Sequence, residues 1–365
     1  MMTPLLSVRD LKVHFPIRKG LFRGEIRNVK AVDGVSFDIA PGESLALVGE
    51  SGCGKSTLGA AVLGMQIPTS GTISFAGEAV RHGERATRTR LSRDIQTVFQ
   101  DPVAALNPKM SVGDSIAEPL AIHGVGDAKS RAERVAELLR LVGLHPQHAE
   151  RRPNAFSGGQ RQRIVIARAL ALQPKLLILD EPVSALDVSI RSQILNLLLD
   201  LQKRFGLAYL FISHDLSVVR HFADRVAVMY LGKLVETGPT DTIFARPVHP
   251  YTEALLSAVP LPDPVLQRTR RRIVLTGDLP SPANPPKGCA FVTRCPLAVD
   301  ICRREPPRWF MSALPSRLHA ICAHKCRRRR KRQDEQPPLN HVHQCRGRAA
   351  IAAPSLLASR FTLGS

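Results

Sequence analysis

The architecture of this 365-residue chain follows from one segment, Gly49-Glu50-Ser51-Gly52-Cys53-Gly54-Lys55-Ser56. The segment comes after an apolar run at 45–48 and before a helical pattern from Lys55 to about Met65. Its spacing fits G-x-x-x-x-G-K-[ST], in the strand–turn–helix context that this motif requires. Glycines let backbone N–H groups converge on phosphate oxygens, and the dipole of the following helix favours negative charge. We therefore expect a phosphate-binding loop, because a chance glycine-rich turn would seldom have both flanking elements.

The residue types of this loop suit a nucleoside triphosphate. Lys55 would reach the β- and γ-phosphates, and the hydroxyl of Ser56 would ligate Mg²⁺. We include Cys53 for its backbone and assign its thiol no redox role. The predicted nucleotide contacts of the segment are Gly49, Glu50, Ser51, Gly52, Cys53, Gly54, Lys55, Ser56 and Thr57.

Two acidic residues follow the unbroken apolar run at 176–179, which is typical of a strand buried on both faces. Ligands bind beyond the carboxyl ends of strands in open parallel sheets, so Asp180 is placed to hold Mg²⁺. Glu181 is then placed to act as general base on the attacking water. By themselves, two acids after a strand more often mark its solvent-exposed end. The phosphate loop favours the catalytic interpretation.

The remaining pattern alternates strands with helices, which predicts an α/β core over residues 1–240. A basic, glycine-containing stretch at 17–30 separates the first two strands, and we expect it to be a long hairpin loop. Beyond residue 240, proline and cysteine become frequent and periodicity fades, which indicates a smaller appendage. The other predicted elements are strands over 6–15, 32–40 and 209–213, helices within 112–142, 158–172 and 188–204, and a closing hairpin over 225–236.

Several further motifs resemble those of ABC ATPases, in the order that this family uses. Phe156-Ser157-Gly158-Gly159-Gln160 resembles the LSGGQ signature, with Phe in place of the first Leu. Ser184-Ala185-Leu186-Asp187 resembles the D-loop. Gln100 resembles the Q-loop glutamine, His214 the switch histidine, and Phe15 an aromatic residue that stacks on adenine. Taken separately, Gln100 and His214 would more often be ordinary surface and core residues.

The resemblance covers roughly residues 6–240 and implies an ABC-type nucleotide-binding domain. Such a domain has a P-loop NTPase core, an antiparallel β subdomain and a helical subdomain, here at about 101–165. ATP and Mg²⁺ are the implied ligands. Glu181, Gln100 and His214 would be the catalytic residues. The implied Mg²⁺ ligands are Ser56, Gln100 and Asp180.

The resemblance also implies a shared site between two ATPase subunits. In this family the signature of one subunit presents donors to the γ-phosphate of the nucleotide in the other. A chain with one signature and one phosphate loop cannot complete a site alone, so we expect a head-to-tail dimer. The resemblance assigns this role to Ser157 and Gly159, and it makes Gly158, Gln160 and Asp187 further nucleotide contacts.

The C-terminal quarter narrows the choice within the family. Pro247-Val248-His249-Pro250-Tyr251-Thr252 resembles the HPYT element of oligopeptide/dipeptide importer ATPases, and a cysteine-bearing extension follows it. The stretch 5–325 resembles the DppF/OppF type, the second ATPase of a heterodimeric peptide importer. This implies a second ATPase subunit, two membrane permease subunits and an extracytoplasmic peptide-binding protein as partners. It also implies a peripheral location on the cytoplasmic face of the bacterial inner membrane.

Four cysteines of the extension, Cys289, Cys295, Cys302 and Cys322, are candidates for a metal centre. Four thiolates suit tetrahedral Zn²⁺ or an iron–sulfur cluster. No C-x₂-C pair occurs among them, which weakens the zinc-ribbon interpretation. Some relatives are thought to carry a [4Fe–4S] cluster here, and reduced structural cysteines are the plain alternative. We expect this extension to span 241–326.

The chain is basic, with 51 Lys and Arg against 31 Asp and Glu and a formal net charge of +20. The last part, 327–365, has nine Lys and Arg against two acids. Its Arg/Lys run could contact anionic lipid or nucleic acid, but we interpret the segment as a solvated, disordered tail. No apolar run reaches the roughly 18–20 residues that cross a bilayer, and no signal peptide is evident. The charge leaves one alternative, a soluble ABC ATPase acting on nucleic acid or ribosomes. Such proteins commonly carry two cassettes or a coiled-coil insertion, which this sequence lacks, so we expect no nucleic-acid partner.

Overall fold

The computed structural model describes residues 3–18, 26–260, 263–269, 272–305, 309–311 and 317–319. All of these residues belong to one compact unit. Cys322 and the basic tail at 327–365 lie outside the described residues, so the structure does not test the predictions made for them. The expected boundary near residue 240 falls between a strand that ends at Pro239 and a helix that begins at Thr240.

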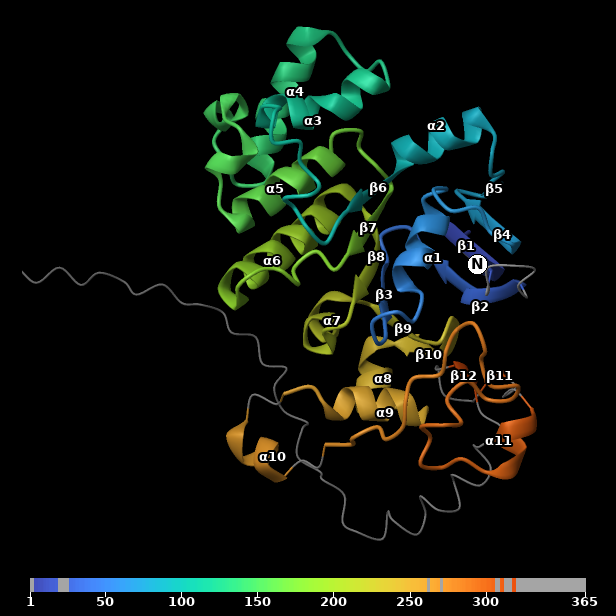
Figure 1. The fold of residues 1–365 in the computed structure, drawn as a ribbon. Helices are drawn as coiled ribbons and strands as arrows, with labels where there is room; N and C mark the ends of the chain where they lie inside the picture. Colours follow the sequence, from blue (N-terminus) through green and yellow to red (C-terminus); the bar gives the residue numbers. More distant parts are fainter. Residues whose placement is uncertain are drawn as a thin grey trace, which may run out of the picture. The chain divides into compact units, whose positions relative to one another are not determined.

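An eight-stranded sheet forms the centre of the molecule (Figure 1). Its last five strands, in the order given below, are mutually parallel, and the first three continue the sheet in antiparallel pairs. The order is β11 (Trp309–Met311), β12 (Arg317–His319), β10 (Lys233–Pro239), β9 (Arg225–Tyr230), β3 (Ser44–Val48), β8 (Ala208–Ser213), β7 (Leu176–Asp180) and β6 (Ile95–Val98).

The apolar runs noted in the sequence are the central strands of this sheet. Every residue of β3 and β8 is buried, as are the first four residues of β7. Alternate side chains enter two hydrophobic clusters, one on each face: Leu177 and Phe211 belong to one cluster, Ile178 and Leu210 to the other. Burial on both faces is the reason that these strands are apolar throughout.

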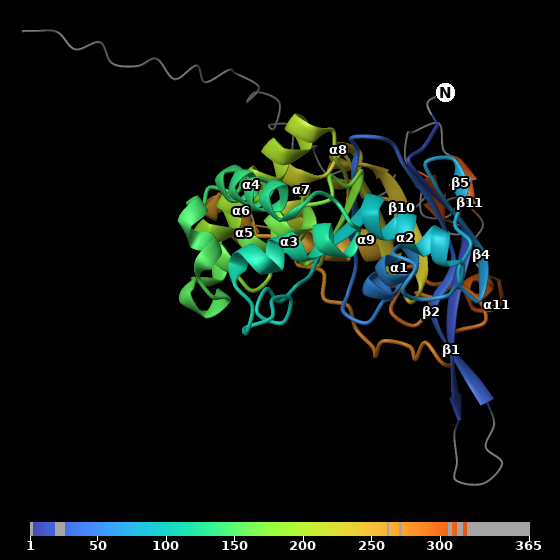
Figure 2. The same ribbon diagram turned by 90° about the horizontal axis from the view of Figure 1, so that it is seen from above.

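A second sheet is antiparallel and has the order β2 (Ile26–Ile39), β1 (Leu6–Arg18), β4 (Ser70–Phe75), β5 (Glu78–Ala79). Figure 2 shows β1 and β2 as a long pair of strands. The expectation of a loop from residue 17 to 30 was wrong at both of its ends, because Ile17 pairs with Arg27 and Arg18 with Ile26. The N–H and C=O groups of two antiparallel strands bond to one another whatever the side chains are. Basic side chains therefore do not prevent these strands from pairing. Residues 19–25 lie outside the described part.

Three helices and two 3₁₀ turns lie between β6 and β7, in the part of the chain for which a helical subdomain is predicted. They lie together in Figure 1, with α3 and α4 beside α5. Side chains spaced by three or four residues, such as Val135, Leu138 and Leu139, are buried between them. The elements are α3 (Val112–Ile122), α4 (Ala128–Leu141), Pro146–Glu150, Pro153–Ala155 and α5 (Gly158–Ala169).

The remaining helices of the core connect strands, either within the eight-stranded sheet or between the two sheets. Helix α1 (Lys55–Val62) contacts β1 and β2 of one sheet and β7 and β8 of the other. Helix α6 (Val188–Phe205) follows β7, and α7 (Leu216–Phe222) follows β8. Helix α2 (Arg85–Asp94) was not predicted, because Leu91 is its single buried residue and its sequence has no apolar period.

The C-terminal extension packs on the ATPase core. Its helices are α8 (Thr240–Ala245), α9 (Pro250–Ser257), α10 (Pro264–Thr269) and α11 (Asp300–Arg304). Tyr251 and Phe291 are fully buried, and their rings lie 4.7 and 5.2 Å from the ring of Tyr230 at the end of β9. The extension therefore shares the hydrophobic core of the domain. Within the described part of the chain, no helix is long and apolar enough to cross a membrane.

Candidate nucleotide site

The phosphate loop leaves β3 and enters α1 through backbone conformations that only glycine adopts readily. Gly49, Gly52 and Gly54 have φ values of 155°, 78° and 108°. A Cβ on Gly49 would lie 2.2 Å from the carbonyl oxygen of Met229, and one on Gly54 would lie 2.0 Å from that of Ala31. Close backbone approach thus requires glycine at Gly49 and Gly54, and the positive φ favours it at Gly52. Together they form the cradle that the motif predicted.

Lys55 lies beneath this loop and bonds to it. Its side chain is buried, and Nζ donates to the carbonyl oxygens of Gly49 at 2.8 Å and Glu50 at 3.0 Å. Burial raises the pKa of the neighbouring Cys53 thiol, in spite of the opposing charge of Lys55. A buried ammonium group beside a cradle of glycines fits a polyphosphate, whose charge it would balance.

Ser56, which follows β3, and Asp180, the last residue of β7, come together. Ser56 Oγ donates to Asp180 Oδ1 at 3.4 Å. Burial and the adjacent charge of Glu181 raise the pKa of Asp180, while the Ser56 hydrogen bond and Lys55 oppose this shift. A hydroxyl and a carboxylate at the end of the loop are ligands that suit Mg²⁺. The residues present therefore fit the metal that the motif implies.

Glu181 stands at the centre of the expected catalytic group. Gln100 Nε2 donates to Glu181 Oε2 at 3.1 Å, and His214 Nδ1 lies 3.0 Å from Glu181 Oε1. Glu181 has a φ of 48°, a strained value for a residue with a side chain, and its N–H donates to the carbonyl oxygen of Ile212 at 2.9 Å. The structure thus gathers three residues that are separated by 81 and 33 positions in sequence.

The signature segment begins helix α5. Ser157 caps this helix in a reciprocal arrangement with Gln160: Gln160 N–H donates to Ser157 Oγ, and Ser157 N–H donates to Gln160 Oε1. Gly159 leaves no room for a side chain, because a Cβ would lie 2.5 Å from Ile190 of α6. Asp187 precedes α6 as its N-cap residue. No hydrogen bond or ion pair among the described residues joins this segment to the phosphate loop.

The comparisons with known proteins agree with this geometry. Residues 32–184 match the ABC transporter family, and residues 235–302 match the C-terminal region of oligopeptide/dipeptide transporters. The oligopeptide transport ATP-binding protein AppF of Bacillus subtilis (strain 168) is 54% identical over 88% of this chain and 97% of its own length. The chain belongs to the oligopeptide/dipeptide ABC transporter ATPases. The prediction of this family from the sequence is confirmed.

Other relatives of this transporter ATPase support the same assignment. The dipeptide transport ATP-binding protein DppF of Escherichia coli (strain K12) is 52% identical, over 84% of this chain and 90% of its own. Among solved structures, cbiO1 of Clostridium perfringens, part of the ABC transporter complex cbiONQ, covers 67% of this chain and 91% of its own at 30% identity and a TM-score of 0.58. The dimeric, post-hydrolysis cassette MJ0796 bound to ADP and phosphate covers 64% and 98%, at 28% identity and a TM-score of 0.56. The ABC-type fold is confirmed.

Phe15 lies on β1, opposite Val29 of β2, and 37% of it is exposed. An exposed aromatic ring on a strand is available to stack on a planar base. The side chain of the neighbouring His14 contacts Asp33, with 3.1 Å between His14 Nε2 and Asp33 Oδ1. The adenine-stacking role of Phe15 in this transporter ATPase stays a prediction.

The sequence did not predict two contacts that the extension makes with the phosphate loop. Arg294 pairs with the Glu50 carboxylate, and the Tyr251 hydroxyl accepts a hydrogen bond from the Glu50 N–H. Tyr251 belongs to the HPYT element, and Arg294 lies between two of the noted cysteines. These motifs were visible, but nothing local indicated that they reach the loop.

The described cysteines of the extension do not form a metal site. Cys289, Cys295 and Cys302 are not part of a disulfide, and burial raises the pKa of Cys289. Cys289 N–H donates to the Cys302 carbonyl oxygen at 2.8 Å, which joins two of them through the backbone. Within the residues that the structure describes, no group of three or more His, Cys, Asp or Glu side chains could hold a metal ion. Cys322, the fourth candidate ligand, lies outside them.

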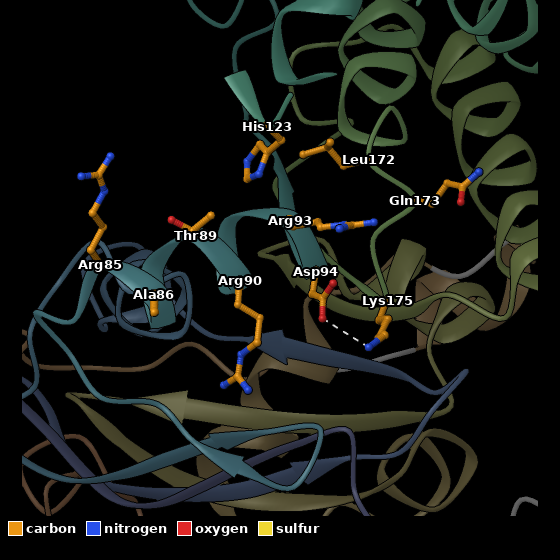
Figure 3. Close-up of a pocket in the computed structure, with 10 residues that line it drawn as sticks. All are labelled: Arg85, Ala86, Thr89, Arg90, Arg93, Asp94, His123, Leu172, Gln173 and Lys175. Atoms are coloured by element: carbon orange, nitrogen blue, oxygen red, sulfur yellow. Dashed lines mark hydrogen bonds and ion pairs between the residues drawn. The ribbon is translucent and has the colours of Figure 1, made fainter. Parts of the chain in front are cut away.

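A cavity of about 1020 Å³ lies beside α2, away from the phosphate loop. Figure 3 shows its basic lining, which includes Arg85, Arg93 and Lys175, and the 3.2 Å ion pair between Lys175 and Asp94. None of the predicted nucleotide contacts lines this cavity. It is a positively charged surface feature separate from the ATP site.

Proposed function

We propose that this ABC ATPase hydrolyses ATP to drive import of di- or oligopeptides through separate membrane permeases. The observation that carries the hydrolytic part is the placement of Glu181 between Gln100 and His214, beside Ser56 and Asp180. The transported class is supported by the match of residues 235–302 and by the relatives named for oligopeptide and dipeptide transport. The substrate itself would be selected by a binding protein and the permeases.

The chemistry assigned to the site is in-line transfer of the γ-phosphoryl group to water. Lys55 would bind the β- and γ-phosphates after leaving its carbonyl partners on the loop. Glu181 would accept the proton of the attacking water, while Gln100 and His214 keep its carboxylate oriented. Ser56, Asp180 and Gln100 would hold Mg²⁺, which when bound neutralises charge on the phosphates.

The proposed working form is a head-to-tail dimer with a second ATPase subunit. Ser157 and the α5 N-terminus would then face the γ-phosphate of nucleotide held by the partner. This is supported by the signature having no bond to the chain's own loop within the described residues. The dimeric cassette that this chain resembles offers a precedent for the arrangement.

Permease contact is proposed at the surface around Gln100. Phe99 and Val103, on either side of it, are 45% and 54% exposed. Exposed apolar side chains of this kind suit a protein partner. Because Gln100 bonds to Glu181, a permease that presses on this surface would act on the catalytic carboxylate. The protein would accordingly lie on the cytoplasmic face of the inner membrane.

A metal centre in the extension stays a weaker proposal, because it requires Cys322 to join Cys289, Cys295 and Cys302. Elemental analysis of protein purified without oxygen tests it. About one zinc per protein, or about four irons as a [4Fe–4S] cluster requires, lost on Cys295→Ser, would support the centre. Protein free of both metals, with all four thiols open to alkylation in the folded state, would refute it.

The experiment that separates transport from the alternative function is co-purification from membranes. The tagged full chain should retain a second ATPase subunit and permeases in detergent, and its ATPase rate should rise when a peptide-loaded binding protein is added. Retention of RNA or ribosomes in place of membrane subunits would favour the soluble, nucleic-acid function suggested by the net charge of +20.

A further inference from the structure

Two residues of the extension hold the second residue of the phosphate loop. Arg294 donates from Nη1 to Glu50 Oε2 at 2.7 Å and from Nη2 to Glu50 Oε1 at 3.1 Å. The hydroxyl of Tyr251 accepts from the N–H of Glu50 at 2.9 Å. A two-bond arginine–carboxylate pair is directional and stronger than a neutral hydrogen bond. Both the side chain and the N–H of Glu50 are therefore fixed from outside the loop.

Glu50 also bonds to the lysine that we expect on the ATP phosphates. Its carbonyl oxygen accepts from Lys55 Nζ at 3.0 Å, and the preceding carbonyl of Gly49 accepts at 2.8 Å. Glu50 is thus the point where the contacts of the extension and those of Lys55 meet. A shift of this residue would move the acceptors of Lys55 and the start of the cradle together.

Arg294 is itself held in place. Its side chain is 11% exposed. The backbone N–H of Arg294 donates to the carbonyl oxygen of Phe291 at 3.1 Å. The Phe291 ring is buried against Tyr230 and Tyr251. Tyr230 ends β9, the strand beside β3, from which the loop leaves. Because these neighbours hold the arginine in place, the pair differs from an exposed ion pair between two free side chains.

We propose that Arg294 is a positioning residue for ATP binding, which fixes Glu50 and thereby the phosphate loop in its receptive conformation. The inference rests on the proposed nucleotide-binding role of this loop. It gives the extension a part in the ATP site that the motifs of the ATPase core do not supply. The plain alternative is that the pair only attaches the extension to the core.

The test compares nucleotide affinity, turnover and thermal stability in variants of the full chain. Arg294→Gln keeps the length of the side chain but removes its charge and its fork, so we expect a Kd for a fluorescent ATP analogue about tenfold higher. Arg294→Lys restores the charge without the fork and should recover part of the affinity. Tyr251→Phe should weaken binding by a smaller factor. With ATP, KM should rise while kcat changes little, because Arg294 touches no reacting atom.

The matched control is Arg225→Gln. Arg225 pairs with Glu43 at 2.8 Å at the start of β9, the opposite end from Tyr230. This variant should lose a comparable amount of stability and leave the Kd unchanged. Hydrogen exchange gives a second readout: amides of 49–54 should exchange faster in Arg294→Gln and at the wild-type rate in Arg225→Gln.

Three outcomes would overturn the proposal. One is a Kd for Arg294→Gln within twofold of wild type while its melting temperature falls. Another is unchanged exchange of the loop amides. If Arg294→Gln does not fold, wild-type affinity in both Arg294→Lys and Tyr251→Phe would overturn it equally. If wild-type protein itself binds no nucleotide, the proposed function fails. If wild type binds nucleotide and the variants bind it equally well, only the role of Arg294 fails.

Discussion

Ser56 and Asp180 are joined by a hydrogen bond of 3.4 Å across 124 positions of sequence. One follows the parallel strand β3 and the other ends β7, with β8 between these strands. Their meeting shows why the two motifs act together: parallel strands deliver their carboxyl ends to one edge, where phosphate, Mg²⁺ and water would gather. The predictions below concern this edge and the contacts that support it.

Loss of the loop lysine should remove most nucleotide affinity. Lys55→Ala deletes an ammonium group that would form charge-assisted bonds to phosphates, so we expect ATP to bind about 10- to 100-fold more weakly. Titration calorimetry with the full chain measures this. Lys175→Ala, which breaks the ion pair with Asp94 at the separate cavity, is the control. Equal affinity in Lys55→Ala and wild type would refute the phosphate-loop assignment.

The close approach at Gly54 predicts a second loss of binding. Gly54→Ala would place a Cβ 2.0 Å from the carbonyl oxygen of Ala31, so the loop must move. We expect a lower melting temperature and a loss of ATP affinity greater than about tenfold. Gly42→Ala is the matched control, because Gly42 also has a positive φ of 73° but nothing within 4 Å of the added carbon. Similar affinities in the two variants would show that the clash is unimportant.

Phe15 should contribute to base binding and not to phosphate binding. Stacking on an aromatic side chain contributes about 1–3 kcal/mol per base, so Phe15→Ala should weaken ATP binding at least about fivefold. Phe15→Tyr should keep the affinity. Inorganic tripolyphosphate has no base, so its inhibition constant in competition with a nucleotide analogue should be the same for Phe15→Ala and Phe15→Tyr. An unchanged Kd for ATP in Phe15→Ala would place the adenine elsewhere.

Asp33 predicts a pH-dependent link between the two sheets. It lies within 3.8 Å of Lys30 and 3.4 Å of Lys233. Burial raises the pKa of Asp33, but Lys233, Lys30 and the His14 bond together lower it below 3.8. An aspartate whose pKa is lowered by folding stabilises the fold at every pH above its unfolded pKa. This stabilisation is lost as the pH falls through the pKa of the folded state. Asp33→Asn should therefore cost about 1 kcal/mol at pH 7.

Urea unfolding of wild type and Asp33→Asn at several pH values measures this difference. The gap in unfolding free energy should be constant well above pH 3.8 and should narrow as the pH approaches and passes below it. A gap that is independent of pH would mean that Asp33 acts through shape or neutral hydrogen bonds alone.

Local motifs made the ATP site predictable, because most of its chemistry lies in short consecutive segments. The phosphate loop is eight residues long, and Asp180 and Glu181 come directly after the apolar run that reveals a buried strand. The family order of Gln100 and His214 then indicated a group whose members the structure brings around Glu181. Their roles in binding and hydrolysis remain predictions that the variants above address.

What the sequence did not reveal depends on contacts between distant segments. Arg294 and Glu50 are 244 residues apart, and no periodicity connects them. Helix α2 forms with only Leu91 buried, so the apolar spacing that identifies helices is missing. The pairing of β1 with β2 at Ile17 and Arg18 likewise depends on backbone hydrogen bonds, which the pattern of side chains does not predict.

The central claim is that Glu181 is the general base of ATP hydrolysis in this transporter ATPase. The most direct measurement is single-turnover ATP hydrolysis by Glu181→Gln beside wild type, in the complex assembled with the second ATPase and the permeases. Because an amide cannot accept the proton of water, we predict a rate about 10²- to 10⁴-fold lower, with ATP affinity within a few-fold of wild type. A hydrolysis rate within a few-fold of wild type, at full ATP occupancy, would contradict the account.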